Sequence, residues 1–193
     1  MPLGSFLKLV EIQTKLASMV PFILGTLYAV YRFRKFDLVN FILMLLSLLA
    51  FDMATTAINN YLDYKRAKKT YGYNYESHNA IVRDNLKESS VIAVILTLLL
   101  FASIMGILLF LNTTVLVLLI GMISFMVGIL YSFGPIPISR TPFGELFSGF
   151  FMGFVIIFLS VYVHSLQQAI IFLAYRDGWL QINANLVELL YIF

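Results

Sequence analysis

Four polar residues recur along one strongly apolar stretch of this sequence. Asp52, Thr56, Asn59 and Asp63 are spaced by four, three and four residues, so they share one face of an α-helix. Asn59 and Asp63, one turn apart, can direct two oxygen donors to one point. Proteins usually hold Mg²⁺ by one or two carboxylates together with substrate phosphates. The spacing therefore indicates a candidate Mg²⁺ site. The alternative is that Asp63 pairs with nearby lysines and Asn59 makes a hydrogen bond between helices.

The composition shows which solvent surrounds this helix. The 193 residues are 61% hydrophobic and 12% charged, with a mean hydropathy of +0.91, whereas soluble domains are about 25% charged. The lipid bilayer is therefore the expected partner of most of the surface. The absence of cysteine excludes disulfides and thiolate metal sites. The net charge of +3 decides neither for nor against nucleic acid, and we expect no nucleic-acid partner.

A membrane-spanning helix needs about 20 mainly apolar residues. The expected helices cover roughly 9–31, 38–58, 90–111, 114–133 and 144–168. The second is expected to continue past the membrane to residue 67, and a sixth to begin near Leu186. The fold class predicted is an all-α, polytopic transmembrane bundle. It forms a single domain over 1–193 that we expect to be incomplete at its C-terminus. A cleavable signal peptide is not expected, because the first apolar run contains Glu11 and Lys15.

The distribution of lysine and arginine predicts the orientation in the cell membrane. With the N-terminus inside, nine of these residues fall on the inner side and four on the outer side, as the positive-inside rule favours. The N-terminus and the loops at roughly 63–89 and 131–145 are then cytoplasmic. Asn59 and Asp63 lie at this cytoplasmic end.

Three segments resemble UbiA-type prenyltransferases, in the form typical of the 1,4-dihydroxy-2-naphthoate polyprenyltransferase branch. NNYLD at 59–63 resembles the first acidic motif of the family, Asn-Asp-Tyr-x-Asp. VPFILGTLYA at 20–29 is similar to the first helix, with its Pro-x-x-x-Gly signature. YSFGPIPISRTPFGE at 131–145 is similar to a Tyr-x-x-Gly-Pro-x-Pro segment that ends in Gly-Glu. The segments follow the order and spacing of the family.

The resemblance implies nine membrane helices around a central cavity and an enzyme that uses Mg²⁺. Such an enzyme transfers a polyprenyl group from a polyprenyl diphosphate to 1,4-dihydroxy-2-naphthoate, in menaquinone biosynthesis. Asn59 and Asp63 would be the catalytic residues and the metal ligands. Asp52 would orient the substrate or line the cavity. The other implied substrate-binding residues are Asn60, Lys65, Arg66, Arg83, Tyr131 and Lys15.

The sequence also departs from the family pattern. Asn60 replaces the first Asp of the acidic motif, and Glu11-Ile12 replaces an Arg-Pro pair, so we suggest that Lys15 binds the anion instead. A third acidic position is Ala67, and Pro135 stands where many relatives have Lys. A second acidic motif is not found in these 193 residues, so this chain alone is expected to be inactive.

Several alternatives remain open at this stage. Lys15 could form an ion pair with Glu11, Arg83 could be a surface charge, and Tyr131 could belong to the aromatic belt of the membrane. The lysines at 65–69 could bind anionic lipid headgroups. For the whole chain, the alternatives are a relative with another aromatic acceptor, or a non-catalytic membrane scaffold or transport protein. The oligomeric state is not predicted.

Overall fold

The computed structural model describes residues 1–67, 79–134, 137–166, 171–176 and 179–192. In these residues, five helical segments are long and apolar enough to cross a membrane: Ile12–Phe33, Leu38–Arg66, Glu88–Asn112, Val115–Ser132 and Gly144–Tyr162. The predicted fold class, an α-helical bundle with five complete membrane helices, is therefore confirmed.

Shorter elements interrupt and connect the five spans. In chain order the elements are α1 Leu3–Leu9, the 3₁₀ turn η1 Ile12–Lys15, α2 Leu16–Phe33, α3 Leu38–Arg66, α5 Ala80–Arg83, α6 Glu88–Asn112, α7 Val115–Ser132, η2 Ile138–Arg140, α8 Gly144–Phe150, the π-helical turn η3 Phe151–Val155, α9 Ile156–Tyr162, β1 Ile171–Arg176, β2 Trp179–Ala184 and α10 Leu186–Ile192.

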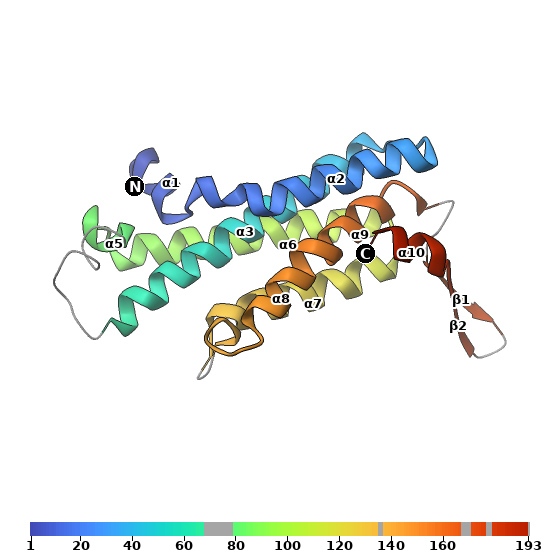
Figure 1. Ribbon diagram of the computed structural model, residues 1–193. Coiled ribbons are helices and arrows are strands. Elements are labelled where there is room, and N and C mark those ends of the chain that lie inside the picture. The colour runs from blue at the N-terminus through green and yellow to red at the C-terminus, as the bar shows by residue number, and fades with distance from the viewer. Residues whose placement is uncertain (68–78, 135–136, 167–170, 177–178, 193) are drawn as a thin grey trace.

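The bundle has two distinct ends, which Figure 1 shows at opposite sides of the molecule. One end, here called the α5 end, contains α1, α5, the C-terminus of α3 and η2. The other, here called the hairpin end, contains the connection from α2 to α3 and the β1–β2 hairpin. Helix α3 runs toward the α5 end, so Asn59 and Asp63 lie there.

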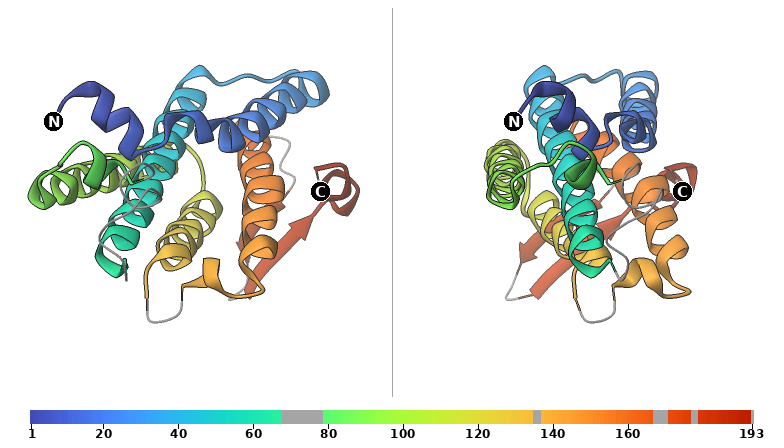
Figure 2. Two further views of the ribbon diagram at one scale, coloured as in Figure 1. Left: turned by 60° about the vertical axis from the view of Figure 1, so that its left-hand side comes forward. Right: turned by 90° about the vertical axis from the view of Figure 1, so that its left-hand side faces the viewer.

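Helix α3 is the central element of the bundle. In the right-hand view of Figure 2, α3 lies between α6 on one side and α8–α9 on the other. Helix α3 packs along α6, and α2 packs along α9. The α2–α9 contact is close at Gly25, where a Cβ atom would lie 2.7 Å from the carbonyl oxygen of Ile157. The glycine of the Pro-x-x-x-Gly segment therefore allows two membrane helices to approach each other.

The bounds of two predicted helices need correction. The first predicted helix, at 9–31, is interrupted because Glu11 adopts φ 48°, so α1 ends before it and α2 begins only at Leu16. The fifth, predicted at 144–168, ends at Tyr162. Beyond it, residues 171–176 and 179–184 form the two antiparallel strands of a hairpin, in which Ile171 pairs with Ala184. Branched and aromatic residues in IFLAYR and WLQINA favour strands.

Helix α10 begins where the start of a sixth helix was predicted, at Leu186. Its Glu188 is 4% exposed and accepts hydrogen bonds from Tyr28 Oη at 3.0 Å and from Arg32 Nε at 2.9 Å. These bonds hold α10 against the last turns of α2.

Candidate active site at the α5 end of the bundle

The predicted polar stripe divides into two parts along α3. Asn59 and Asp63 are exposed at the α5 end, whereas Asp52 and Thr56 are partly buried. Asp52 and Asp63 are eleven residues apart, about 16 Å along the helix axis. The two parts therefore have different surroundings: the exposed surface near Asp63, and the interior of the bundle near Asp52.

Lys15 supplies the charge that Asp52 needs inside the bundle. Its ammonium group donates to Asp52 Oδ1 at 2.7 Å, to Thr56 Oγ1 at 2.6 Å and to the carbonyl oxygen of Asp52 at 3.2 Å. Ser18 Oγ donates to the other carboxylate oxygen of Asp52 at 2.5 Å. Lys15 is 4% exposed. The contacts explain how a carboxylate is tolerated at this depth, because a buried charge requires a partner and hydrogen bonds.

The position of Lys15 bears on two of the alternatives. Its partners are on α3, and the i, i+4 ion pair with Glu11 is not among the ion pairs of the described residues. All three acceptors of the ammonium group lie on α3. An anion-binding role for Lys15 would require at least one of these hydrogen bonds to break.

Asn60 faces a different direction from its neighbour Asn59. Asn60 is 9% exposed, and its amide nitrogen donates to the carbonyl oxygen of Leu9 at 2.9 Å and to Glu11 Oε1 at 3.1 Å. The resemblance implies a substrate-binding role for Asn60. In this structure its side chain contacts the N-terminal segment.

Lys65 and Arg66 extend from the last turn of α3. The Lys65 ammonium lies 2.7 Å from Glu88 Oε2, at the start of α6, and 5.9 Å from the centre of the Tyr61 ring. Arg66 donates from Nη2 to the carbonyl oxygen of Gly134, which follows α7, at 2.8 Å. Both side chains are exposed, so these contacts are weak in water and can be exchanged for contacts with an anion.

Arg83 ends α5 and lies 3.3 Å from Asp84 Oδ1. The pKa of Asp84 is held below its usual value, first by a hydrogen bond from Ser5 and then by the charges of Arg83 and Lys8. Asp84 thereby joins α1 to α5. With 39% of its side chain exposed, Arg83 remains accessible from the α5 end.

A cavity of about 570 Å³ lies inside the bundle and is lined mainly by apolar side chains of α3, α7 and α8–α9. Asp52 and Tyr131 both line it, although they are far apart in the sequence. One wall is formed by the rings of Phe51 and Phe125, which stack with their centres 4.0 Å apart. The cavity can hold a long apolar chain, with a carboxylate and a phenol at its surface.

The contacts identify Ser18 and the aromatic pair Phe51–Phe125 as further candidate residues. Ser18 follows Lys15 by three residues, so the helical period places both on one face. That signal was present in the sequence. No comparable signal connects Phe51 with Phe125, because they come from different helices.

The oxygen donors at the exposed end of α3 suit a metal ion that binds together with a substrate. Among the described residues, no three histidine, aspartate or glutamate side chains form a group that could hold a metal ion by themselves. Asn59 and Asp63 offer an amide oxygen and a carboxylate on one exposed helix face. This set fits Mg²⁺, which keeps waters and takes further oxygen ligands from a bound phosphate.

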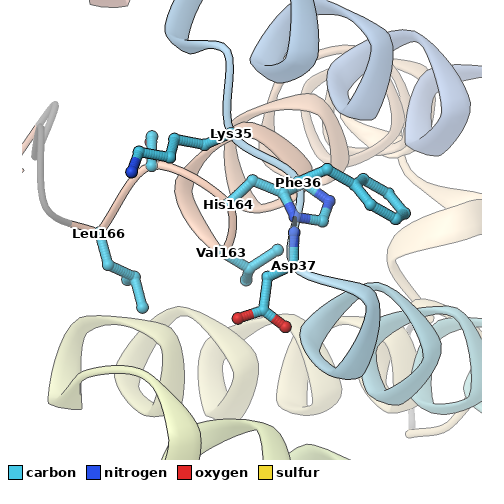
Figure 3. Close-up of a pocket in the computed structure, with 7 residues that line it drawn as sticks. Lys35, Phe36, Asp37, Val163, His164 and Leu166 are labelled. Carbon is cyan, nitrogen blue, oxygen red and sulfur yellow. Dashed lines mark hydrogen bonds between the residues drawn. The ribbon is translucent and has the colours of Figure 1, made fainter.

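A second pocket, of about 180 Å³, lies at the hairpin end between the residues around Asp37 and those around His164 (Figure 3). His164 Nδ1 accepts a hydrogen bond from the backbone N–H of Asp37 at 3.1 Å, and its ring stacks on Phe36. Burial lowers the pKa of His164, and the Asp37 carboxylate partly opposes this effect. Asp37 precedes Asn59 by 22 residues, about 33 Å along α3. This pocket is therefore remote from the polar end of the helix.

Comparison of the sequence with known proteins identifies its family. The model of the UbiA prenyltransferase family matches residues 18–176. The chain is 37% identical over 153 residues to a protein of Bacillus subtilis (strain 168) described as 1,4-dihydroxy-2-naphthoate octaprenyltransferase. The match covers 79% of this chain and 49% of that protein, so the chain spans about half the length of its relative. No solved structure matches the chain.

Proposed function

Because the chain belongs to the UbiA prenyltransferase family, we propose that the protein is a membrane enzyme that transfers a polyprenyl group from a polyprenyl diphosphate to 1,4-dihydroxy-2-naphthoate, in menaquinone biosynthesis. The observation that carries this proposal is the position of Asn59 and Asp63. They are exposed at the end of α3, and the same helix continues to an apolar cavity lined by Asp52 and Tyr131. The relative described as an octaprenyltransferase favours the naphthoate acceptor.

Asn59 and Asp63 would hold Mg²⁺ together with the diphosphate of the donor. The metal ion would neutralise the negative charge that develops on the leaving diphosphate. Lys65, Arg66 and Arg83 would bind the remaining phosphate oxygens. To bind the phosphate oxygens, Lys65 would release Glu88, and Arg66 would release the carbonyl oxygen of Gly134.

Prenyl transfer separates a negative diphosphate from an allylic cation. The exposed part of the polar stripe on α3 suits the diphosphate, and the part at the cavity suits the cation. When the allylic C–O bond breaks, the electron pair leaves with the diphosphate toward the α5 end. The electron-rich ring of the acceptor then attacks the allylic carbon, and the naphthoate carboxylate is lost as carbon dioxide. The apolar walls of the cavity would exclude water, which would otherwise capture the cation. Lys15 and Ser18 hold the Asp52 carboxylate in place at the cavity surface.

The multi-pass membrane location follows from the five spans and the family. The proposed orientation places the N-terminus and the α5 end in the cytoplasm, where soluble diphosphates and Mg²⁺ are present. This orientation rests on the excess of lysine and arginine at that end.

The test is an assay of the longest natural protein that contains this chain, in membranes with a polyprenyl diphosphate, 1,4-dihydroxy-2-naphthoate and Mg²⁺. Asp63→Asn should reduce transfer by about 100-fold or more, because it removes the carboxylate that this helix end offers to the metal ion. Asp37→Asn makes the same chemical change at the hairpin end, where Asp37 caps α3 by accepting from the N–H of Asn40. Asparagine caps equally well, so this control should keep full activity. Intact transfer by Asp63→Asn would refute the assignment of Asp63 as a metal ligand. If the protein prenylated only a different aromatic compound, the proposed acceptor would be wrong.

A further inference from the structure

The N-terminal segment crosses α3 at Asn60, one residue from the proposed metal ligand Asn59. The two amide hydrogen bonds of Asn60 reach the carbonyl oxygen of Leu9 and the carboxylate of Glu11. Leu9 is fully buried and packs with Ala57 and Ile81 in one apolar cluster. The hydrogen bonds of Asn60 thus lie beside a dry core, where they are stronger than in water.

Asn60 also contacts the segment that follows α3. The backbone carbonyl oxygen of Asn60 accepts a hydrogen bond from Asn79 Nδ2 at 2.9 Å. Asn79 caps α5, because its Oδ1 accepts from the N–H of Ile81 at 2.9 Å. Asn60 therefore joins three segments: the N-terminal segment, α3 and α5, which ends with Arg83.

The backbone of Glu11 accommodates this contact. Glu11 has φ 48° and ψ 61°, a left-handed conformation that residues with a Cβ atom seldom adopt. It separates α1 from η1, and Thr14 Oγ1 donates to the Glu11 carbonyl oxygen at 2.8 Å. The turn brings the Glu11 carboxylate within 3.1 Å of the Asn60 amide.

Positions 11 and 60 are also places where the first helix and the acidic motif depart from the family pattern. The pattern has an arginine at the first position and an aspartate at the second, whereas this chain has Glu11 and Asn60. The structure shows that the two departures are in direct contact.

We propose that Asn60 is a positioning residue whose side chain is energetically coupled to that of Glu11. The coupled pair fixes the N-terminal segment against the turn of α3 that carries Asn59 and Asp63. The effect on catalysis rests on the proposed function, but the coupling itself does not.

Thermal unfolding of purified protein in detergent tests the coupling without any substrate. Asn60→Asp places two carboxylates in contact, and Glu11→Arg removes one of the two acceptors of the Asn60 amide. Each change should lower the unfolding temperature by about 5 °C. The double variant Glu11→Arg/Asn60→Asp places a guanidinium beside a carboxylate and should unfold within about 2 °C of the unchanged protein. A loss in the double variant equal to the sum of the two single losses would overturn the proposal.

Two further variants control for misfolding of Glu11→Arg and for long-range effects of the introduced charges. If Glu11→Arg does not fold, Glu11→Gln replaces it, since its amide can donate to the carboxylate introduced by Asn60→Asp. That double variant must then be more stable than Asn60→Asp alone, and otherwise the proposal fails. The matched control is Asn59→Asp, the same change on an exposed neighbour. It should show no coupling with Glu11→Arg, and equal coupling at both positions would contradict a contact at Asn60.

The activity assay separates positioning from metal binding. Asn60→Asp should lower kcat/KM about tenfold, Glu11→Arg should restore most of the loss, and the Mg²⁺ concentration for half-maximal activity should not change. A changed Mg²⁺ requirement with an unchanged unfolding temperature would place Asn60 in the metal site and overturn the proposal. If no variant or parent protein transfers prenyl groups, the proposed function fails, while the unfolding temperatures still decide the coupling.

Discussion

Lys15 and Asp52 form an ion pair between the first two membrane spans, with 2.7 Å between Nζ and Oδ1. Their side chains are 5% and 17% exposed. The pair connects η1, at the start of the first span, with α3, whose Asp52 lines the large cavity. Its burial makes it important for stability and, under the proposed function, for the shape of the substrate site.

Lys15→Met should destabilise the protein by about 3–5 kcal/mol, because it leaves the Asp52 carboxylate buried without a counter-charge. Adding Asp52→Asn should recover part of this loss. Thermal or denaturant unfolding in detergent measures both. Lys8→Met is the matched control, since Lys8 is half exposed and lies 3.8 Å from Asp84, and it should cost less than about 1 kcal/mol. Equal losses at Lys8 and Lys15 would contradict this account.

Gly25→Ala should separate α2 from α9. The new Cβ atom would lie 2.7 Å from a backbone oxygen of α9, which cannot rotate away as a side chain could. We expect a loss of about 1–3 kcal/mol in the free energy of unfolding. In Gly149→Ala, nothing lies within 4 Å of the new Cβ atom, and alanine favours the helix. This control should be neutral or stabilising, and a neutral Gly25→Ala would show that the helices can move apart freely.

Gly121→Leu should shorten the apolar chain that the cavity accepts. Gly121 lines the cavity, and nothing lies within 4 Å of the place that a Cβ atom would take there. Under the proposed function, kcat/KM for a long polyprenyl donor should fall about tenfold or more relative to a short one. Competition between the two donors, with analysis of the products, measures the ratio. Gly149→Leu, outside the cavity lining, should leave the ratio unchanged. An unchanged ratio in Gly121→Leu would place the donor chain elsewhere.

Stability should fall on acidification through His164. The folded protein keeps the pKa of His164 below 6.5, the value of an unperturbed histidine, because the ring is buried. The unfolded chain then binds more protons, so the contribution of His164 is complete above about pH 6.5 and decreases as the pH falls toward the lowered pKa. Protonation would also remove the acceptor for the Asp37 N–H.

Unfolding temperatures measured between pH 8 and pH 5 test this expectation. Those of the unchanged protein should decrease below about pH 6.5, and His164→Phe should reduce the slope in that range. An equally steep slope in His164→Phe would show that other groups cause the acid sensitivity.

The sequence was sufficient for the membrane helices, because hydropathy and helical period are properties of neighbouring residues. The α3 helix, for example, ends at Arg66, close to its predicted end. Two features were missed for local reasons. The break at Glu11 depends on a left-handed residue that composition does not indicate. The hairpin at 171–184 comes from short apolar runs that periodicity cannot distinguish from helix.

For the candidate site, the sequence by itself determined which residues share the face of α3, since their spacing follows the helix. It also supplied the family resemblance, which the comparisons confirm. Only the tertiary structure decided the partners of these residues: Lys15 for Asp52, Glu11 for Asn60, and a common cavity for Asp52 and Tyr131. The physical reason is that contacts between helices depend on how the helices cross and pack. Residues as far apart in the sequence as Glu11 and Asn60 then become neighbours, and no local pattern records which ones.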